Sequence, residues 1–416
     1  MKSWSWLAGA ALAVLAFGTA EAQETPRKGG VLRMTAPYAA SFGSLDPHVT
    51  PRAQDDIVNK AIHRTLYNWD TKEGKLVLEL AKSVSVSADG LTYTYKLRDD
   101  AFFHNGRKMT ADDIIWSFTR IMDGSKGYPA ARYVRLIKGA VDVEKGQAKE
   151  ISGLKKIDDF TLEMTITDRV DPGYYFFAGS TAILPKEEVE KGNFASNPVG
   201  LGPFKFKEHI PGSRVSTERF DKFYKTGKPY LDRVDVMIMA EAAARDVAFR
   251  NKEIDTSILG PAQYVAYRED AQLKNGILEV PEMFTRAITF NHSHKPFDDK
   301  RVRQAFNLAI DRKKIITYVL QGQAAGPGIH GLVPGSMPGY AADKIKGYDF
   351  DLTKAKALMA EAGYPNGQGF PAMTLNLNSG GGRNQEVAEA MTEMLNKGLG
   401  INVTMQILEW PQHQEL

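Results

Sequence analysis

Large apolar side chains alternate with polar ones along several short stretches of the chain, a period typical of β-strands. Residues 91–97 place two Leu and two Tyr on one face, with Thr and Lys on the other. Residues 234–238 and 401–407 repeat the alternation with Val, Ile and Met as the large members. We therefore predict a strand over each stretch, with its apolar face turned toward a core.

Other stretches space their apolar residues three and four apart, which predicts helices. The clearest one begins after Thr110, where Asp113 completes a capping box, and its apolar stripe stops before Gly124. Further helices are expected from Asp299, from Asp311 to Gly322, from Asp351 to Gly363, and from Asn384 to Lys397 with Gly398 as its stop. The last helix leads directly into the strand at 401–407. Helix, short turn and strand in this order predict an α/β fold.

The first 22 residues have the form of a secretory signal. Lys2 gives a positive start, residues 4–17 are almost wholly apolar, and residues 20–22 read Ala-Glu-Ala, the small-x-small form that signal peptidase cuts. The alternative is a membrane anchor, but this apolar run is shorter than the roughly 20 residues that a spanning helix needs. We expect residues 1–22 to be cleaved before Gln23, which leaves an exported protein that is soluble in the periplasm.

Composition excludes several functions. The 416 residues contain 53 Lys and Arg and 50 Asp and Glu, and a well-mixed net charge of +3 argues against a nucleic-acid-binding surface. The absence of Cys excludes disulfides, thiolate metal sites, cysteine nucleophiles and a lipid-carrying cysteine. There is no Gly-x-Ser-x-Gly elbow, no Gly-Lys-Ser/Thr phosphate loop and no His-Glu-x-x-His motif. We therefore expect a binding protein without catalytic residues or a cofactor.

Two weaker patterns have plain structural interpretations. Residues 326–331 fit G-x-G-x-x-G, but a predicted helix precedes them and Pro334 follows, so a surface loop is expected instead of a dinucleotide site. His292 and His294 are two residues apart and can face one metal ion. Two ligands do not complete a metal site, so a solvated turn is the preferred interpretation and a metal-carrier role remains an alternative.

A set of short segments points to a known family. They read SLDP at 44–47, LRDDAFFHNG at 97–106, NPVGLGPF at 197–204, PFDDKRVRQA at 296–305, AIDR at 309–312 and AEAGYP at 360–365. In this order they resemble the peptide-type extracellular solute-binding proteins of family 5, which are the oligopeptide, dipeptide and nickel carriers of ABC importers. Leu201 departs from the Thr that is usual in its segment.

The resemblance implies a two-lobed, Venus-flytrap periplasmic binding protein with an extra subdomain in its first lobe. The expected division is residues 24–63 and 195–280 for the first lobe, 64–194 for the inserted subdomain, and 281–416 for the second lobe. Family members run on well past the Glu-Trp segment at 409–410, whereas this chain ends at Leu416. A C-terminally truncated fragment with an incomplete second lobe is therefore expected.

The resemblance also implies which residues bind the ligand. They are Pro51, Arg52 and Ala53 in the loop after SLDP, Met283, Phe284, Thr285 and Arg286 at a strand entry near the hinge, Trp410 as a pocket wall, and Tyr128 and Tyr133 from the inserted subdomain. No metal-binding residue is implied.

The function that follows is binding of peptides in an interlobe cleft and their delivery to an inner-membrane ABC permease with its ATPase subunits. The protein is expected to act as a monomer and to hold an extended peptide through main-chain hydrogen bonds. A nickel, metal-chelate or haem carrier on the same scaffold is one alternative. A secreted hydrolase is a second alternative from another class, and a periplasmic sensor partner is a third.

Overall fold

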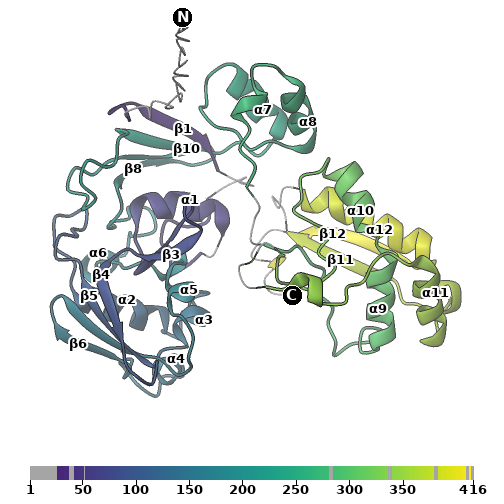
Figure 1. The fold of residues 1–416 in the computed structure, drawn as a ribbon, viewed down its shortest axis with the longest axis horizontal. Coiled ribbons are helices and arrows are strands. Elements are labelled where there is room, and N and C mark those ends of the chain that lie inside the picture. The colour runs from purple at the N-terminus through teal and green to yellow at the C-terminus, as the bar shows by residue number, and fades with distance from the viewer. Residues whose placement is uncertain are drawn as a thin grey trace, which may run out of the picture.

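The fold is α/β and two-lobed. The computed structural model describes residues 26–36, 42–50, 52–280, 284–335, 337, 340–378, 383–408 and 412–413. Figure 1 shows the elements from β1 (Val31–Thr35) to α8 (Pro261–Glu269) in one body and those from α9 (Lys300–Ala309) to β12 (Val403–Leu408) in another. Among the described residues, none of the helices combines the length and the apolar composition that a membrane-spanning helix requires.

The first sheet joins segments that are far apart in the sequence. Its order is β1-β10-β9-β8, where β8 is Phe204–Ile210, β9 is Arg214–Arg219 and β10 is Arg233–Met237. Strand β1 runs parallel to β10, and the other pairs are antiparallel. The strand predicted at 234–238 is confirmed, because Val234 and Val236 of β10 face a core shared with helix α1 (Ala53–Ile62).

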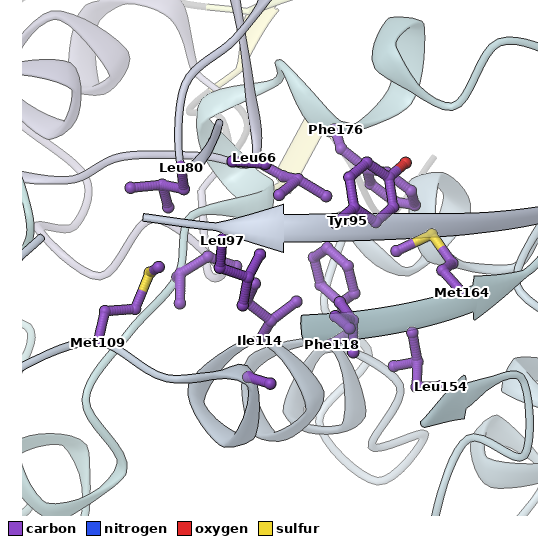
Figure 2. Packing of buried hydrophobic residues seen from close by; sticks show 14 of the residues in the cluster. Leu66, Leu80, Tyr95, Leu97, Met109, Ile114, Phe118, Leu154, Met164 and Phe176 are labelled. Atoms are coloured by element: carbon purple, nitrogen blue, oxygen red, sulfur yellow. The ribbon is translucent and has the colours of Figure 1, made fainter. Parts of the chain in front are cut away.

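A second sheet and its helices form the largest core. The sheet order is β4-β5-β7-β6, all antiparallel, with β4 at Ala81–Val86, β5 at Thr92–Leu97, β6 at Leu154–Asp158 and β7 at Thr161–Thr165. Figure 2 shows Tyr95 of β5 close to Phe118 of α2 (Ala111–Ile121) and Phe176 of α5 (Gly173–Phe176). The rings of Phe118 and Phe176 stack with centroids 4.9 Å apart. The predicted strand at 91–97 is thus β5, and its apolar face lies in this core.

Smaller elements complete the first body. They are β2 (Tyr67–Asp70) and β3 (Lys75–Leu78), which pair with each other, helices α3 (Ala131–Val134), α4 (Ala140–Glu144), α6 (Lys186–Val189) and α7 (Ala242–Arg250), and 3-10 turns at Gly179–Thr181 and Lys274–Gly276.

The second body has a core of its own, formed by residues from Phe290 onward. Strands β11 (Met373–Asn378) and β12 pair in parallel, and the connection between them contains α12 (Asn384–Leu399). The other elements are α10 (Arg312–Lys314), which continues into a π-helical turn at Ile315–Val319, α11 (Leu352–Glu361), and 3-10 turns at Ala342–Lys344 and Pro365–Gly367.

The predicted helix starts are confirmed. Asp113 of α2 accepts the backbone N–H of Thr110 at 2.8 Å, which completes the capping box. In the second body the side chains of Asp299, Asp311 and Asp351 accept the backbone N–H groups of Arg301, Lys314 and Lys354. Each satisfies a donor that the first turn of its helix leaves without a partner.

Three predicted helix ends are wrong. The helix that begins after Asp311 ends with its π-helical turn at Val319, before Gly322. Helix α2 ends at Ile121, before Gly124. Gly124 is needed for a different reason, since a Cβ there would lie 2.0 Å from the carbonyl oxygen of Glu144. Helix α12 runs through Gly398 to Leu399, and Gly400, with a left-handed φ of 71°, is the residue that ends it.

The strand expected at the hinge is also absent from the described residues. Residues 284–290 belong to no helix or strand, and no described strand pairs with them. The G-x-G-x-x-G segment at 326–331 is a loop, as predicted.

Candidate functional site

The predicted ligand-binding residues lie in both bodies. Arg52 and the backbone of Ala53 lie at the start of α1, and Tyr128 and Tyr133 lie around α3. Phe284, Thr285 and Arg286 lead into the second body. Pro51, Met283 and Trp410 are outside the described residues, as is the side chain of Ala53.

The segment that leads into α1 is fixed on one side by Asp55. We call residues 42–50 and Arg52 the α1 entry loop. The buried carboxylate of Asp55 accepts the hydroxyl of Thr50 at 2.6 Å and the backbone N–H of Gly43 at 2.8 Å. The Nε of Arg52 lies 3.3 Å from the same carboxylate. Burial raises the pKa of Asp55, although these hydrogen bonds act against the shift.

The same loop is fixed on its other side by Arg120 of α2. Arg120 donates to both carboxylate oxygens of Asp46, over 2.6 Å and 3.2 Å, and to Nδ1 of His48 over 2.7 Å. Nε2 of His48 lies 2.8 Å from the carbonyl oxygen of Ala182. Burial has the largest single effect on the pKa of Asp46, and this effect favours the protonated form. The hydrogen bonds from Arg120 and from the backbone N–H of His48, together with the charge of Arg120, act in the opposite direction, and the pKa of Asp46 is lowered.

Tyr128 covers this arrangement. The guanidinium carbon of Arg120 lies 4.8 Å from the centre of the Tyr128 ring, and the ring meets His48 edge-on with centroids 6.3 Å apart. The predicted residues Arg52 and Tyr128, which are remote in sequence, therefore belong to one network around the α1 entry loop. Tyr133 lies apart from it, where its hydroxyl accepts from Arg132 at 2.8 Å.

A hollow of about 390 Å³ opens beside Tyr128. Charged groups of both signs line it, including Asp123, Arg132, Arg135 and Glu144. Arg135 and Glu144 form a close ion pair, and Asp123 accepts from the backbone and hydroxyl of Ser125. These side chains are thus already partnered within the chain.

The second group of predicted residues lies against the N-terminus of α12. Arg286 donates from Nε to the side-chain oxygen of Asn384 over 3.0 Å, and its guanidinium lies 5.6 Å from the centre of the Phe284 ring. The Phe284 side chain is 64% exposed, so it offers an apolar surface that the described residues do not cover. Arg286 and Phe284 therefore form a contact surface beside the helix start.

Gln323 connects the second body to the first. Its side-chain amide donates to the carbonyl oxygen of Leu259, between α7 and α8, over 3.4 Å. The backbone carbonyl oxygen of Gln323 accepts from the side chain of Arg383, at the N-terminus of α12, over 3.4 Å. The bodies thus touch at the same end of α12 that holds Arg286.

His292 and His294 occupy an exposed turn, as the preferred interpretation of their spacing predicted. In the part of the chain that the structure describes, no group of three or more His, Asp or Glu side chains is placed to hold a metal ion.

Sequence reasoning missed the parts of the network that lie away from the ligand candidates. Asp46 belongs to the SLDP segment, through which the resemblance identified the loop. Its partner Arg120, however, lies 74 residues away in the sequence. Nothing in the spacing of α2 distinguishes Arg120 from the other polar residues of that helix. His48 carried no motif either.

Comparison with known proteins gives matches over most of the chain. Residues 75–416 match the sequence profile of the bacterial extracellular solute-binding proteins, family 5 Middle. The oligopeptide-binding protein AppA of Bacillus subtilis (strain 168) is 30% identical over 394 residues, which cover 89% of this chain and 67% of AppA. The heme-binding protein A of Haemophilus influenzae is 32% identical over 316 residues, which cover 71% of this chain and 56% of that protein.

A solved structure agrees with the fold. The structure of AppA from Bacillus subtilis in complex with a nonapeptide has a TM-score of 0.74 and 27% sequence identity to this chain, and the match covers 94% of this chain and 77% of that one. The chain thus spans about two-thirds of the curated AppA sequence.

Proposed function

Because the chain belongs to the bacterial extracellular solute-binding proteins of family 5, we propose that it is the peptide-binding component of an ABC importer. The observation that carries the proposal is the likeness to AppA, whose solved structure holds a nonapeptide. In this proposal the chain is exported by a signal at residues 1–22 and binds peptides in the periplasm without cleaving them. It then delivers them to an inner-membrane permease with ATPase subunits.

The division of the chain into two bodies supports this role. Each body has its own hydrophobic core, so each can move as a unit while the segments between them change conformation. We assign the α1 entry loop to one side of the peptide and residues 284–286 to the other. Residues 284–290 form no ladder with any described strand, and main-chain groups in such a segment suit an extended peptide.

A second candidate ligand is haem. It is favoured by the likeness to the heme-binding protein A of Haemophilus influenzae, which at 32% is as similar in sequence as AppA over a shorter stretch. The exposed His292 and His294 are the imidazoles that this candidate would use as iron ligands.

Thermal unfolding separates the candidates. The protein is heated alone, with an equimolar mixture of synthetic peptides from dipeptides to nonapeptides, with haem, and with nickel chloride. We expect the midpoint temperature of unfolding to rise with the peptide mixture and not with haem or nickel chloride. A ligand that binds only the folded state stabilises that state. A rise with haem or nickel but not with peptides would replace the proposal, and shortened peptides recovered afterwards would replace it with a hydrolase.

Variants assign the binding surface. Arg286→Ala removes the guanidinium beside Asn384 and should reduce the midpoint shift caused by peptides. Arg214→Ala is the matched control, because Arg214 pairs with Glu208 on the first sheet and is not among the residues assigned to the peptide. Equal shifts in the two variants would remove Arg286 from the site.

A further inference from the structure

The contact between Arg120 and the α1 entry loop is buried and crosses a long stretch of sequence. Asp46 is 4% exposed and His48 is fully buried, and the side chain of Arg120 is 14% exposed. A buried guanidinium–carboxylate pair is retained at a cost in desolvation, and removing one partner leaves an uncompensated charge. The three side chains therefore act as one unit.

Hydrogen-bond chemistry permits only one protonation pattern in this unit. The carbonyl oxygen of Ala182 can only accept, so Nε2 of His48 carries the proton. The guanidinium of Arg120 can only donate, so Nδ1 of His48 presents its lone pair. Asp46 is the carboxylate that accepts both arms of the guanidinium. Within the unit, each of these donors therefore meets an acceptor. This pairing favours a single arrangement of the loop.

The loop is held from both sides within a few residues. Asp46 and His48 attach it to α2, and Gly43 and Thr50 attach it to Asp55 of α1. Arg52, two residues after Thr50, pairs with the same Asp55. Asp46 lies between Gly43 and Thr50, which both bond Asp55, so a shift of Asp46 would strain the contacts that hold the loop to α1.

We propose that Arg120 is a positioning residue for ligand binding, which fixes the α1 entry loop through Asp46 and His48 so that Arg52 meets the peptide in one orientation. The inference rests on the proposed function. Arg120 would not touch the peptide. It would act by holding the groups that do, since a binding surface retains its geometry only when a supporting layer of contacts fixes it.

The test compares Arg120→Met with Arg107→Met. Arg107 also pairs with carboxylates, Asp113 at 2.6 Å and Glu187 at 2.7 Å, but it does not reach the α1 entry loop. Each variant thus loses a guanidinium that belongs to α2, as in Arg120, or pairs with it, as in Arg107. The readouts are amide hydrogen exchange across residues 42–50 without ligand, and affinity for the mixture of synthetic peptides by calorimetry.

Arg120→Met should speed exchange in residues 42–50 and weaken peptide affinity by about tenfold, a typical size for coupling between a site and its support. Arg107→Met should change neither. Arg120→Lys, which keeps the charge but reaches fewer acceptors, should fall between the wild type and Arg120→Met, and it provides a folded variant if methionine is not tolerated.

Unchanged exchange in Arg120→Met, or faster exchange with wild-type affinity, would overturn the inference. If the wild type binds no peptide, the proposed function fails, and exchange in residues 42–50 still decides whether Arg120 fixes the loop.

Discussion

His104 donates its Nε2–H to the carbonyl oxygen of Gly202 over 3.0 Å, and its Nδ1 accepts the backbone N–H of Gly200 at 3.2 Å. The two family-like segments FHNG and NPVGLGPF therefore meet in space, although 98 residues separate His104 from Gly202. Gly202 also donates its N–H to the carbonyl oxygen of Ile62, at the end of α1, over 2.7 Å. Both motifs are explained by this junction and require no ligand.

Gly202→Ala should destabilise the first body strongly. A Cβ at Gly202 would lie 2.2 Å from the carbonyl oxygen of Ala61, a backbone atom that cannot move alone. We expect a loss of about 3 kcal/mol or more in the free energy of unfolding, measured by chemical denaturation. Gly326→Ala is the control, because its Cβ would meet nothing within 4 Å, and it should stay within about 0.5 kcal/mol of the wild type. Equal losses would contradict the junction.

Acidification should destabilise the protein between about pH 6.5 and pH 4. Burial lowers the pKa of His48 and His104 to about 4 and that of His63 to about 3, from 6.5. In this window the unfolded chain binds protons that the folded protein does not, so stability is full above pH 6.5 and falls as the pH drops toward the folded-state values. Each histidine contributes a slope of up to about 1.4 kcal/mol per pH unit.

Denaturation curves recorded at several pH values within this window measure that slope. His104→Asn removes one of the three histidines that bind a proton on unfolding in this window. The variant's stability should therefore depend less steeply on pH, whatever its stability at pH 7. A wild-type stability that stays constant from pH 6.5 to pH 4.5 would contradict the burial of these imidazoles in their neutral form.

Two aromatic residues of α5 should respond differently to truncation. Phe176 is fully buried and stacks on Phe118, whereas Tyr174 is 54% exposed. Phe176→Ala should reduce the free energy of unfolding by about 3–5 kcal/mol through lost burial and the cavity it leaves. Tyr174→Ala should change it by no more than about 0.5 kcal/mol. Similar losses in the two variants, measured by urea denaturation, would mean that the core does not include Phe176.

The end of α12 can be tested with two neighbouring glycines. Gly400 has a left-handed φ of 71°, and a Cβ there would lie 2.5 Å from the carbonyl oxygen of Asn366, so Gly400→Ala should cost about 2 kcal/mol or more. At Gly398 a Cβ would meet the end of the Leu352 side chain at 3.0 Å, and alanine favours the helix by about 1 kcal/mol. Gly398→Ala should therefore be much milder in thermal unfolding. A larger loss of stability in Gly398→Ala than in Gly400→Ala would indicate that the helix ends at Gly398.

Local chemistry made much of this fold predictable. The capping box of Thr110 and Asp113 and the N-caps at Asp299, Asp311 and Asp351 depend on residues within one turn, and the structure forms all of them. The strands at 91–97 and 234–238 followed from alternation alone. The two-lobed architecture came from the resemblance, because periodicity does not determine how strands from residues 31–35 and 204–237 join in one sheet.

The remaining features depend on contacts between distant segments. Glycine is needed at 124 and 202 because the carbonyl oxygens of Glu144 and Ala61 leave no room for a Cβ. Local sequence does not show that these oxygens lie close to the two glycines. Arg120 looks like any polar residue of an amphipathic helix until Asp46 and His48 are placed beside it. The strand entry expected at residues 283–286 came from the resemblance, and a strand there requires a pairing partner, which local sequence does not identify.

Native mass spectrometry of the protein after incubation with the defined peptide mixture shows whether the chain binds peptides without cleaving them. We expect a population whose added mass equals one intact peptide, and free peptides of unchanged length in the same sample. Protein that stays folded yet gains no peptide mass, or gains only cleaved fragments, would contradict it.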